Sequence, residues 1–383
     1  MATGMRTSLT DTTNQKRVIS DVIKNIDPRD VPLIWLLGLD NEKKFQLQNF
    51  PSAKIEWLED TDNPIADQLA EALDNSETGV DVDNATYFHV GDIIQVDDEQ
   101  MWVSAIAAPT LTVTRGFGGT TAATHDDDSP VYIRSNARLE GAESTDSYTT
   151  TLTNPYNYAQ TMHEEIKVSR FEQLVTKYGM ADTFNYYLAK VLGGGTGDGK
   201  RGSAGELMRR LARTFYYGKR VLRTTSVPGV MGGFDYFVTT NVTTLTGTPA
   251  LTQKHLEDEI QNCWEGGGMP DTIVVNGWGK RKITSFYKDA VRTDRSEKMG
   301  GTVISSVTTE FGELDIVLDR WSPTNSLRIM DTKKLGWLTI DPFHFEELAK
   351  TGDYTRGQVV GDYTFALCNE KAHAIISGFS TSK

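Results

Sequence analysis

Charge is distributed along this chain in two long blocks of opposite sign. Between Ile55 and Thr114 the sequence contains fourteen acidic residues and no Lys or Arg, whereas Lys190 to Arg223 contains nine basic residues and two acidic ones. A monomeric enzyme usually mixes the charges on its surface, so blocks of this length indicate complementary surfaces that meet between subunits or face different surroundings. The charge pattern therefore favours an assembly protein over a catalyst.

Composition sets outer limits on the kind of protein. The chain has 383 residues, 38% of them hydrophobic, which is enough for two or three domains with real cores. Its formal net charge of −13 argues against a free nucleic-acid binder, although a local basic face can still contact phosphates. Two distant cysteines, no apolar run near the roughly 20 residues of a membrane span and no signal-peptide core at Met1–Leu9 predict a protein of a reducing cytoplasm.

The region from Tyr87 to Ile133 is typical of a small β module. Short β runs separated by turn residues are predicted at Asp92–Val96, Met101–Ile106, Leu111–Arg115 and Val131–Ile133. Strands this short can close into a barrel, because closure removes their exposed edges. Long polar flanks on both sides predict that the module is an insertion.

Helical spacing returns after this module. Apolar residues three or four apart predict a helix over Ile166–Leu192, which the glycine-rich stretch Gly193–Gly205 interrupts. A second helix is predicted from Ser203 to Leu222, with Leu207, Leu211 and Phe215 on one side and Arg209, Arg213 and Arg220 on another.

The C-terminal part reads as a mixture of strands and separate helices. Helices are predicted at Leu251–Trp264 and Trp278–Tyr287, and strands at Thr272–Asn276, Thr302–Glu310, Gly312–Asp319, Ser326–Met330, Leu335–Ile340, Asp362–Leu367 and Ala374–Gly378. This order indicates the α+β class.

One motif resembles a phosphate-binding loop. Gly194 to Lys200 matches its first seven positions, but Arg201 replaces the Ser or Thr that would bind Mg²⁺, and a helical pattern precedes it where a strand is required. We therefore expect a surface loop. The His125–Asp128 run and the scattered histidines lack metal-ligand spacing, so no metal, cofactor or catalytic residues are predicted.

The basic helix allows three interpretations. Arg209, Arg210 and Arg213 can contact nucleic-acid phosphates, pair with the acidic segment of a neighbouring subunit, or form a solvated face. The residues alone leave all three open.

The order of these parts resembles the tailed-bacteriophage major capsid proteins with the Hong Kong 97-like fold. The resemblance rests on short motifs that occur in the same order as in a branch with a β module in its extended loop: Asp27-Pro28-Arg29-Asp30-Val31-Pro32-Leu33, Ile55-Glu56-Trp57-Leu58-Glu59-Asp60-Thr61, Val90-Gly91-Asp92-Ile93-Ile94, Thr114-Arg115-Gly116, Thr239-Thr240-Asn241-Val242-Thr243 and Val274-Val275-Asn276.

This resemblance implies a domain layout. It implies an N-terminal arm and docking segment at 1–50, an extension loop at 51–160 with its β module at about 80–136, a peripheral domain at 161–235 and 327–383 with a spine helix near 203–222, and an axial domain at 236–326. In the family the extension loop lies across an adjacent subunit, so the acidic and basic blocks become partners between subunits. Hexamers, pentamers, a separate scaffolding protein, a portal, a decoration protein and packaged double-stranded DNA are the implied partners.

The sequence thus predicts a noncatalytic shell protein of a virion, assembled in the bacterial cytoplasm. The expected contacts between subunits, or with DNA, are Trp35, Trp57, Glu56, Glu59, Asp60, Asp62, Arg209, Arg210, Arg213 and Arg220. The alternatives are a phosphate-using enzyme centred on Lys200 and a cellular compartment shell on the same fold.

Overall fold

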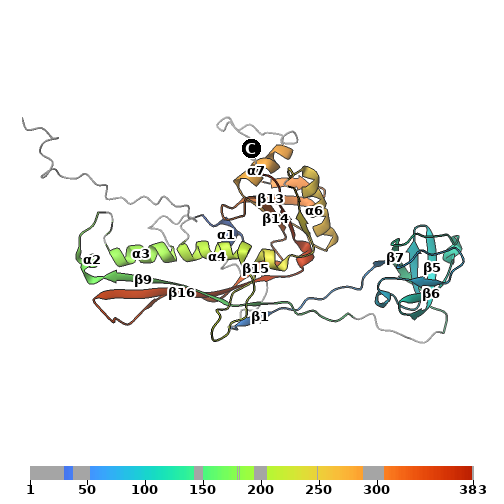
Figure 1. Cartoon of the computed structure of the whole chain (residues 1–383), viewed down its shortest axis with the longest axis horizontal. Helices are drawn as coiled ribbons and strands as arrows, with labels where there is room; N and C mark the ends of the chain where they lie inside the picture. Colours follow the sequence, from blue (N-terminus) through green and yellow to red (C-terminus); the bar gives the residue numbers. More distant parts are fainter. Residues whose placement is uncertain are drawn as a thin grey trace, which may run out of the picture. The chain divides into compact units, whose positions relative to one another are not determined.

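The computed structural model describes residues 30–37, 52–141, 150–178, 180, 182–193, 205–247, 249–287 and 306–381. They belong to two compact units, unit 1 (1–57 and 155–383) and unit 2 (58–154). Figure 1 shows the elements of both. The expected N-terminal arm and the loop Gly194–Lys200 lie outside the described residues, as does the side chain of Trp35.

Unit 2 is inserted into unit 1 between two paired strands. Strand β1 (Lys54–Glu56) pairs antiparallel with β8 (Tyr156–Tyr158), and the next residues along the chain continue the ladder. Thr153 and Glu59 exchange backbone hydrogen bonds of 2.9 and 3.0 Å, so the insertion begins and ends on neighbouring segments.

The strands of unit 2 form one six-stranded sheet in the order β2-β7-β4-β5-β6-β3. Their bounds are β2 (Ala66–Gln68), β3 (Gly79–Asp81), β4 (Asp92–Val96), β5 (Glu99–Ala107), β6 (Thr110–Thr114) and β7 (Pro130–Asn136), with short 3-10 turns η1 (Ala85–Tyr87) and η2 (Phe117–Gly119). The four strands predicted from the sequence are confirmed within β4 to β7.

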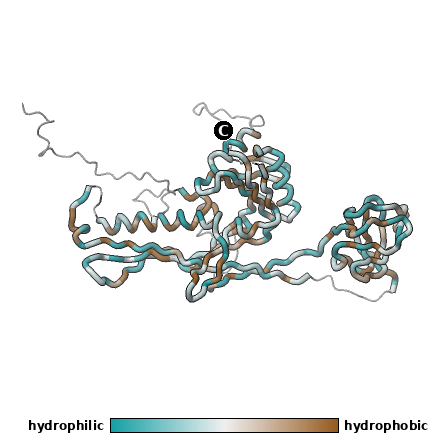
Figure 2. The backbone as a smooth tube through the Cα atoms, viewed as in Figure 1, coloured by the Kyte–Doolittle hydropathy of each residue, from teal (hydrophilic) through white to brown (hydrophobic). Residues whose placement is uncertain are grey.

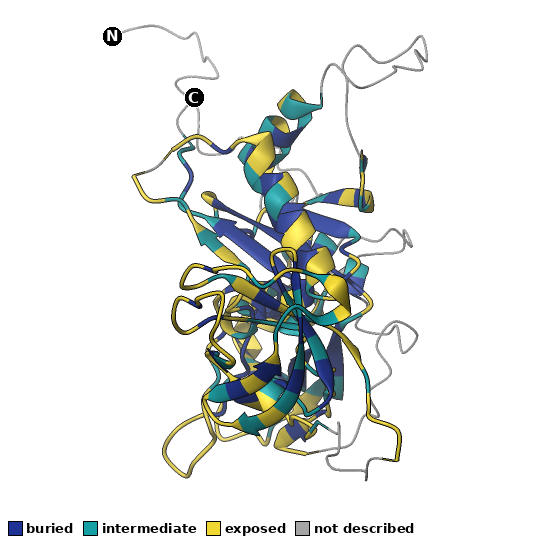
Figure 3. Ribbon diagram, turned by 90° about the vertical axis from the view of Figure 1, so that its right-hand side faces the viewer, coloured by how far each residue is buried: buried dark blue, intermediate teal, exposed yellow. Residues whose placement is uncertain are grey.

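The two edges of this sheet are joined. The Ala70 N–H donates to the Asp81 carbonyl at 2.9 Å, and the Asp83 N–H donates to the Gln68 carbonyl at 3.1 Å, so the sheet closes on itself. Inside lies a core of buried aliphatic side chains such as Ile94, Met101 and Val103. Figure 3 shows buried residues in dark blue along the strands.

In unit 1 a three-stranded antiparallel sheet supports the helices. Strand β16 (Tyr354–Leu367) lies between β15 (Leu335–Glu347) and β9 (Gln160–Ser169). Helices α3 (Thr183–Leu192) and α4 (Glu206–Tyr217) pack on this sheet, as Figure 1 shows. A core that includes Leu207, Leu211 and Phe215 of α4 fills the space between them.

A second sheet of six strands has the order β10-β17-β14-β11-β13-β12. Its strands are β10 (Val242–Thr244), β11 (Thr272–Val275), β12 (Ser306–Thr309), β13 (Gly312–Leu318), β14 (Ser326–Met330) and β17 (Ala374–Ser377). Because alternate side chains face opposite sides of a strand, Ile273 and Val275 meet helices α6 (Gln253–Glu265) and α7 (Gly277–Phe286), while Val274 joins the core of α4.

This sheet crosses the domain boundary expected near residue 326. Strands β14 and β17 belong to this sheet, although the resemblance implies that residues 327–383 are part of the peripheral domain. The remaining elements are α1 (Pro32–Leu37), α2 (Arg170–Leu174), α5 (Phe234–Phe237) and η3 (Glu370–Ala372). Separate helices with mostly antiparallel strands confirm the α+β class.

Two helix predictions need correction. Residues 160–169 form strand β9 instead of the start of a helix over 166–192, because β9 pairs with β16 along its whole length. Helix α4 ends at Tyr217, not Leu222. A Cβ on Gly218 would lie 2.6 Å from the Thr214 carbonyl oxygen, and beyond it Val221 leaves the helix to pair with Val230.

Candidate functional site

Three arginines of α4 surround the carboxylate of Glu206, which lies in the first turn of this helix. Arg209 forms an ion pair with Glu206, and Arg210 and Arg213 approach the same carboxylate at 3.7 and 3.6 Å. Arg210 also reaches Glu164 of β9 at 2.7 Å. The predicted basic face is therefore partly neutralised within the subunit.

The three arginines differ in exposure. Arg209 is 9% exposed, because it lies against the packed side of the helix, so little of it is accessible for the expected contact with a neighbouring molecule. The side chains of Arg210 and Arg213 remain 46% and 44% exposed. These two can still reach a neighbouring molecule.

Arg220 makes its contacts within unit 1. Its guanidinium lies 3.8 Å from the centre of the Tyr156 ring and 5.2 Å from that of Tyr236, and it donates to the Tyr156 carbonyl at 2.7 Å. Such stacking is one that arginine makes well. Arg220 thus fastens strand β8 to the segment after α4.

The predicted acidic contacts lie at the base of the insertion. Glu56 pairs with Lys54 in β1, and Glu59 is half-buried beside its backbone partner Thr153. Asp60 accepts a hydrogen bond of 3.1 Å from Thr150, and Asp62 is exposed.

Trp57 is not an exposed anchor. Its side chain is 4% exposed and packs with Ile55, Leu338 and Ala366, while its ring lies 5.9 Å from that of Phe237. Unit 1 already buries this side chain, and the expected contact of Trp57 with a neighbouring subunit stays a prediction.

A buried polar network beneath α4 was not predicted. Tyr216 donates to Asp319 at 2.6 Å, and Arg328, which is 1% exposed, binds Asp235 through its Nε at 2.7 Å and lies 4.6 Å from the Tyr216 ring. Burial raises the pKa of Asp319 and, together with the Asp319 charge, that of Tyr216. The network joins α4 to the six-stranded sheet of unit 1.

Asp30 extends this connection toward the N-terminus. Its carboxylate pairs with Arg320 at 3.0 Å, and its carbonyl accepts a hydrogen bond of 3.0 Å from the Trp321 indole. No sequence signal marks these long-range partners, which are almost 300 residues apart.

Unit 2 has its own buried network. Arg115 donates to both oxygens of Glu99, at 2.7 and 2.8 Å, and His125 lies between Glu99 and Asp97 at 3.1 and 2.8 Å. Burial alone would raise the pKa of Glu99, but hydrogen bonds from Arg115, the Ala123 N–H and His125 hold this pKa at about 2. Glu99 therefore stays ionised and fastens the loop after β6.

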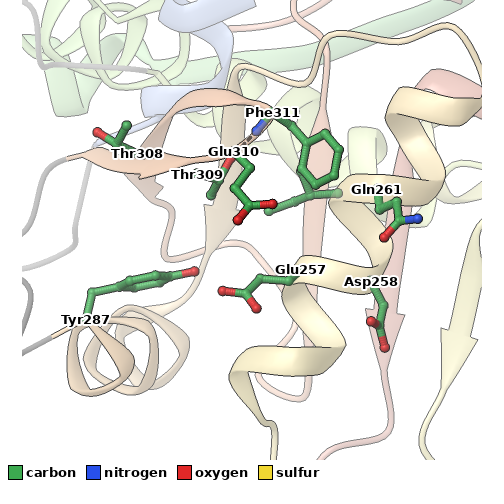
Figure 4. Close-up of a pocket in the computed structure, with 9 residues that line it drawn as sticks. Glu257, Asp258, Gln261, Tyr287, Thr308, Thr309, Glu310 and Phe311 are labelled. Carbon is green, nitrogen blue, oxygen red and sulfur yellow. Dashed lines mark hydrogen bonds between the residues drawn. The ribbon is translucent and has the colours of Figure 1, made fainter.

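A surface pocket of about 560 Å³ lies between α6, the end of α7 and β12. Figure 4 shows the Tyr287 hydroxyl and the carboxylates of Glu257 and Glu310 pointing toward one another. Burial and the charge of Glu257 raise the pKa of Tyr287 to about 12, so its hydroxyl stays protonated near neutral pH and does not act as a base. The arrangement lacks a nucleophile paired with a base.

A second groove, of about 410 Å³, lies along β9 beside α3 and α4. It is lined by charges of both signs, including Glu164, Lys167, Lys190 and Glu206. Within the described residues, no three His, Cys, Asp or Glu side chains gather as metal ligands. None of the helices described is long and apolar enough to cross a membrane.

Comparison with known proteins adds a family and a fold. The family model described as SU10 major capsid protein matches residues 5–380. No curated protein matches significantly. Among solved structures, the capsid asymmetric unit of cyanophage A-1(L) is 11% identical with a TM-score of 0.57, and the match covers 98% of this chain and 99% of that chain.

Two further structures are similar to lesser degrees. The capsid of an empty GTA particle is 8% identical with a TM-score of 0.55, covering 98% of this chain and all of its own. An encapsulin complex from Synechococcus elongatus PCC 7942 is 8% identical with a TM-score of 0.42, covering 60% of this chain and 78% of that one. That last likeness is too weak to support the cellular-compartment alternative.

Proposed function

This chain belongs to the SU10 major capsid protein family, and we propose that its copies assemble into the closed icosahedral shell of a bacteriophage head around double-stranded DNA. The observation that carries the proposal is a family match over nearly the whole chain, together with the Hong Kong 97-like fold of its structural neighbours. The chain is thus a virion component whose role is structural.

The division of charge between the two units supports contacts between subunits. Unit 2 contains 19 of the 52 acidic residues but only 3 of the 39 basic ones. A unit this acidic repels phosphates and is attracted to cationic protein surfaces. We place it away from DNA, against a neighbouring subunit.

The exposed members of the predicted contact set supply specific partners. Asp60 and Asp62 at the base of unit 2 are exposed, and so in large part are Arg210 and Arg213 of α4. We propose that the carboxylates of one copy pair with the arginines of another, in competition with Glu206 and Glu164. This exchange would tie assembly to ionic strength, because salt screens exposed charges.

The proposed shell also implies partner proteins and a place of assembly. The copies would form hexamers and pentamers in the bacterial cytoplasm, with a scaffolding protein, a portal and a decoration protein as separate chains. No catalysis is proposed, since neither described pocket pairs a nucleophile with a base.

Assembly of the purified protein tests the function. The protein is expressed alone and with a candidate scaffold, and its mass is measured by light scattering, with negative-stain electron microscopy of the same fractions. Shells, or discrete pentamers and hexamers, are expected. A monomer under every condition, combined with saturable ATP binding that Lys200→Ala abolishes, would instead support the phosphate-using enzyme.

A further inference from the structure

The pocket between α6, the end of α7 and β12 has an acidic lining. Of the described residues around its volume of about 560 Å³, three are carboxylates, Glu257, Asp258 and Glu310, and none is Lys, Arg or His. Cavities that bind small organic molecules measure roughly 300–1,000 Å³. Figure 2 shows α6, which supplies two of these carboxylates, largely in the hydrophilic teal. We call this cavity the acidic pocket.

Two of the three carboxylates have no cation of their own. Lys254 pairs with Asp258 at 2.7 Å, one helical turn away in α6. Glu257 instead accepts a hydrogen bond of 2.6 Å from the neutral amide of Gln253, and Glu310 has no cationic partner among the residues described. Because like charges that share a cavity repel one another, the acidic pocket favours the binding of a cation.

The hydroxyl of Tyr287 faces the same charge. Figure 4 shows it pointing toward the carboxylates of Glu257 and Glu310. Its oxygen is buried and has no hydrogen-bond partner within the part of the chain that the structure describes. A polar group buried without a partner costs the fold stability, so its presence points to a partner from outside the subunit. An N–H donor between this hydroxyl and Glu257 would supply that partner.

The remaining wall of the acidic pocket is apolar and aromatic. Ile260, which is fully buried, and the half-buried ring of Phe311 both line it. The ring of Trp264, which is 52% exposed, lies 5.7 Å from that of Phe311 and adds to the aromatic surface. Aromatic faces attract ammonium groups, and apolar walls accept the methylene groups that carry them.

This wall suits an organic cation better than a metal ion. Within the described ranges, no three His, Cys, Asp or Glu side chains gather as ligands for a metal. Calcium and magnesium ions require six or more oxygen ligands in a close shell. An alkylammonium group has only three N–H donors, which two carboxylates and one hydroxyl oxygen can accept.

We propose that the acidic pocket binds an alkylammonium cation, held by the carboxylates of Glu257 and Glu310 and by the hydroxyl oxygen of Tyr287, with its methylene chain against Phe311. Such a group has two sources, a free polyamine and a lysine side chain of another protein. The inference does not depend on shell assembly, because one subunit supplies all the residues of the acidic pocket.

Titration of the purified full-length protein with spermidine tests the site. Calorimetry at low ionic strength should show one saturable site per subunit. Glu257→Gln with Glu310→Gln should weaken binding roughly tenfold or more, because each change removes a charge-assisted hydrogen bond. The matched control is Glu265→Gln with Asp315→Asn, which makes the same change of charge at exposed positions of α6 and β13 outside the pocket.

The control should bind spermidine like the wild type. Equal weakening in the two double variants would show that overall charge attracts the cation, and this result would overturn the inference. The absence of saturable binding by the wild type, both to spermidine and to a lysine peptide, would overturn it as well.

Tyr287→Phe distinguishes a ligand-binding hydroxyl from a structural one. The melting temperature should change by less than about 2 °C, because the hydroxyl has no partner among the described residues. Spermidine binding should weaken roughly threefold or more, since one hydrogen bond is lost. A lowered melting temperature with unchanged binding would assign the hydroxyl to the fold and remove this support for the site, overturning the proposed set of ligands.

Two further titrants identify the cation. If acetyl-dilysine amide binds more tightly than spermidine, and Glu257→Gln with Glu310→Gln weakens both, the site belongs to a lysine of another protein; weaker binding of the peptide assigns it to a free polyamine. Magnesium chloride should displace spermidine only as far as sodium chloride of equal ionic strength does. Displacement by stoichiometric magnesium would make the acidic pocket a metal site and overturn the inference.

Discussion

The hydroxyl of Tyr216 donates a hydrogen bond of 2.6 Å to the carboxylate of Asp319, which is completely buried. Tyr216 belongs to α4 and Asp319 directly follows β13, 103 positions later in the sequence. The bond gives the buried Asp319 carboxylate a hydrogen-bond donor at the point where α4 meets the six-stranded sheet of unit 1.

Tyr216→Phe removes this donor and leaves the ring in place. We expect the subunit to lose about 1–3 kcal/mol of unfolding free energy, because a buried carboxylate loses a partner. Urea unfolding measures the loss. Tyr217→Phe, at a neighbouring tyrosine that is 62% exposed, should change stability by less than about 0.5 kcal/mol. Equal effects of the two substitutions would contradict the assigned role.

The Tyr216–Asp319 pair also predicts a pH dependence. Burial raises the pKa of Asp319 in the folded state, so the folded protein binds this proton more readily than the unfolded chain. Stability from this group is therefore gained as pH falls through the raised pKa toward the ordinary value, about 4. We expect the deficit of Tyr216→Phe to shrink as pH is lowered from 7 toward this ordinary value. A deficit that grows over this range would be inconsistent with a buried ionised Asp319.

Glu99→Gln breaks the charge network of unit 2. The loss should be about 3–5 kcal/mol, since Arg115 remains as a buried charge without its partner. Hydrogen exchange of the β4, β5 and β6 amides is the measurement, because it reports on unit 2 separately. Asp98→Asn, one residue away in an exposed turn, is the control. Unchanged protection in Glu99→Gln would show that the network contributes little.

The Glu99 network has the opposite pH dependence. The pKa of Glu99 is lowered from 4.5 to about 2, so its contribution to stability is complete above 4.5 and is lost as pH falls toward 2. Wild-type unit 2 should lose amide protection in this range. Glu99→Gln should lose less, because it has no carboxylate to protonate.

Asp60→Lys with Asp62→Lys tests the proposed pairing between subunits. Shell yield should fall while the melting temperature of the subunit stays within about 2 °C, because both side chains are exposed. Asp126→Lys with Asp127→Lys makes the same change of charge elsewhere in unit 2 and should assemble normally. If both double variants lose shells equally, overall charge and not a local contact is responsible.

Trp57→Ala should destabilise the subunit itself. Removing a large aromatic side chain from a packed core costs about 3–5 kcal/mol. Urea unfolding is expected to show this loss with monomeric protein, before any assembly. A stable monomer that cannot form shells would support Trp57 as a contact between subunits.

Four of the six strands of unit 2, β4 to β7, were predictable because their signal is local, whereas the three-residue strands β2 and β3 were missed. Alternating side chains in β4 and in the first five residues of β5 are buried and half-buried in turn, and turn residues separate the runs. Period and turn chemistry suffice for such elements. The family resemblance rested on a different signal, the order in which short motifs follow one another along the chain, and local patterns do not contain this order.

Strand β9 was not predictable in the same way. The apolar residues counted as one helical stripe from Ile166 to Val191 belong to a strand, a short helix, a turn and α3. Pairing with β16, almost 200 residues later, decides the conformation of β9. The misassigned stripe contains Phe171, Val175 and Tyr178, whose exposure becomes visible only in the folded subunit.

The candidate contacts were predictable only as residue types. Charge blocks identified Arg210, Arg213, Asp60 and Asp62, which are largely exposed, but also Arg209, which is buried. Helical spacing does not report how deeply a neighbouring sheet covers a helix. Glu206 lies in the same helix as these arginines, at local helical spacing, whereas the partners Glu164 and Asp319 depend on tertiary contacts that no motif encodes.

The ladder formed by β1 and β8 makes the two strands independent of what the insertion contains. Because the insertion leaves and returns on paired neighbouring segments, a tight turn between Trp57 and Pro155 can replace it without changing the register of either strand. The same junction offers engineers a place to display a foreign domain.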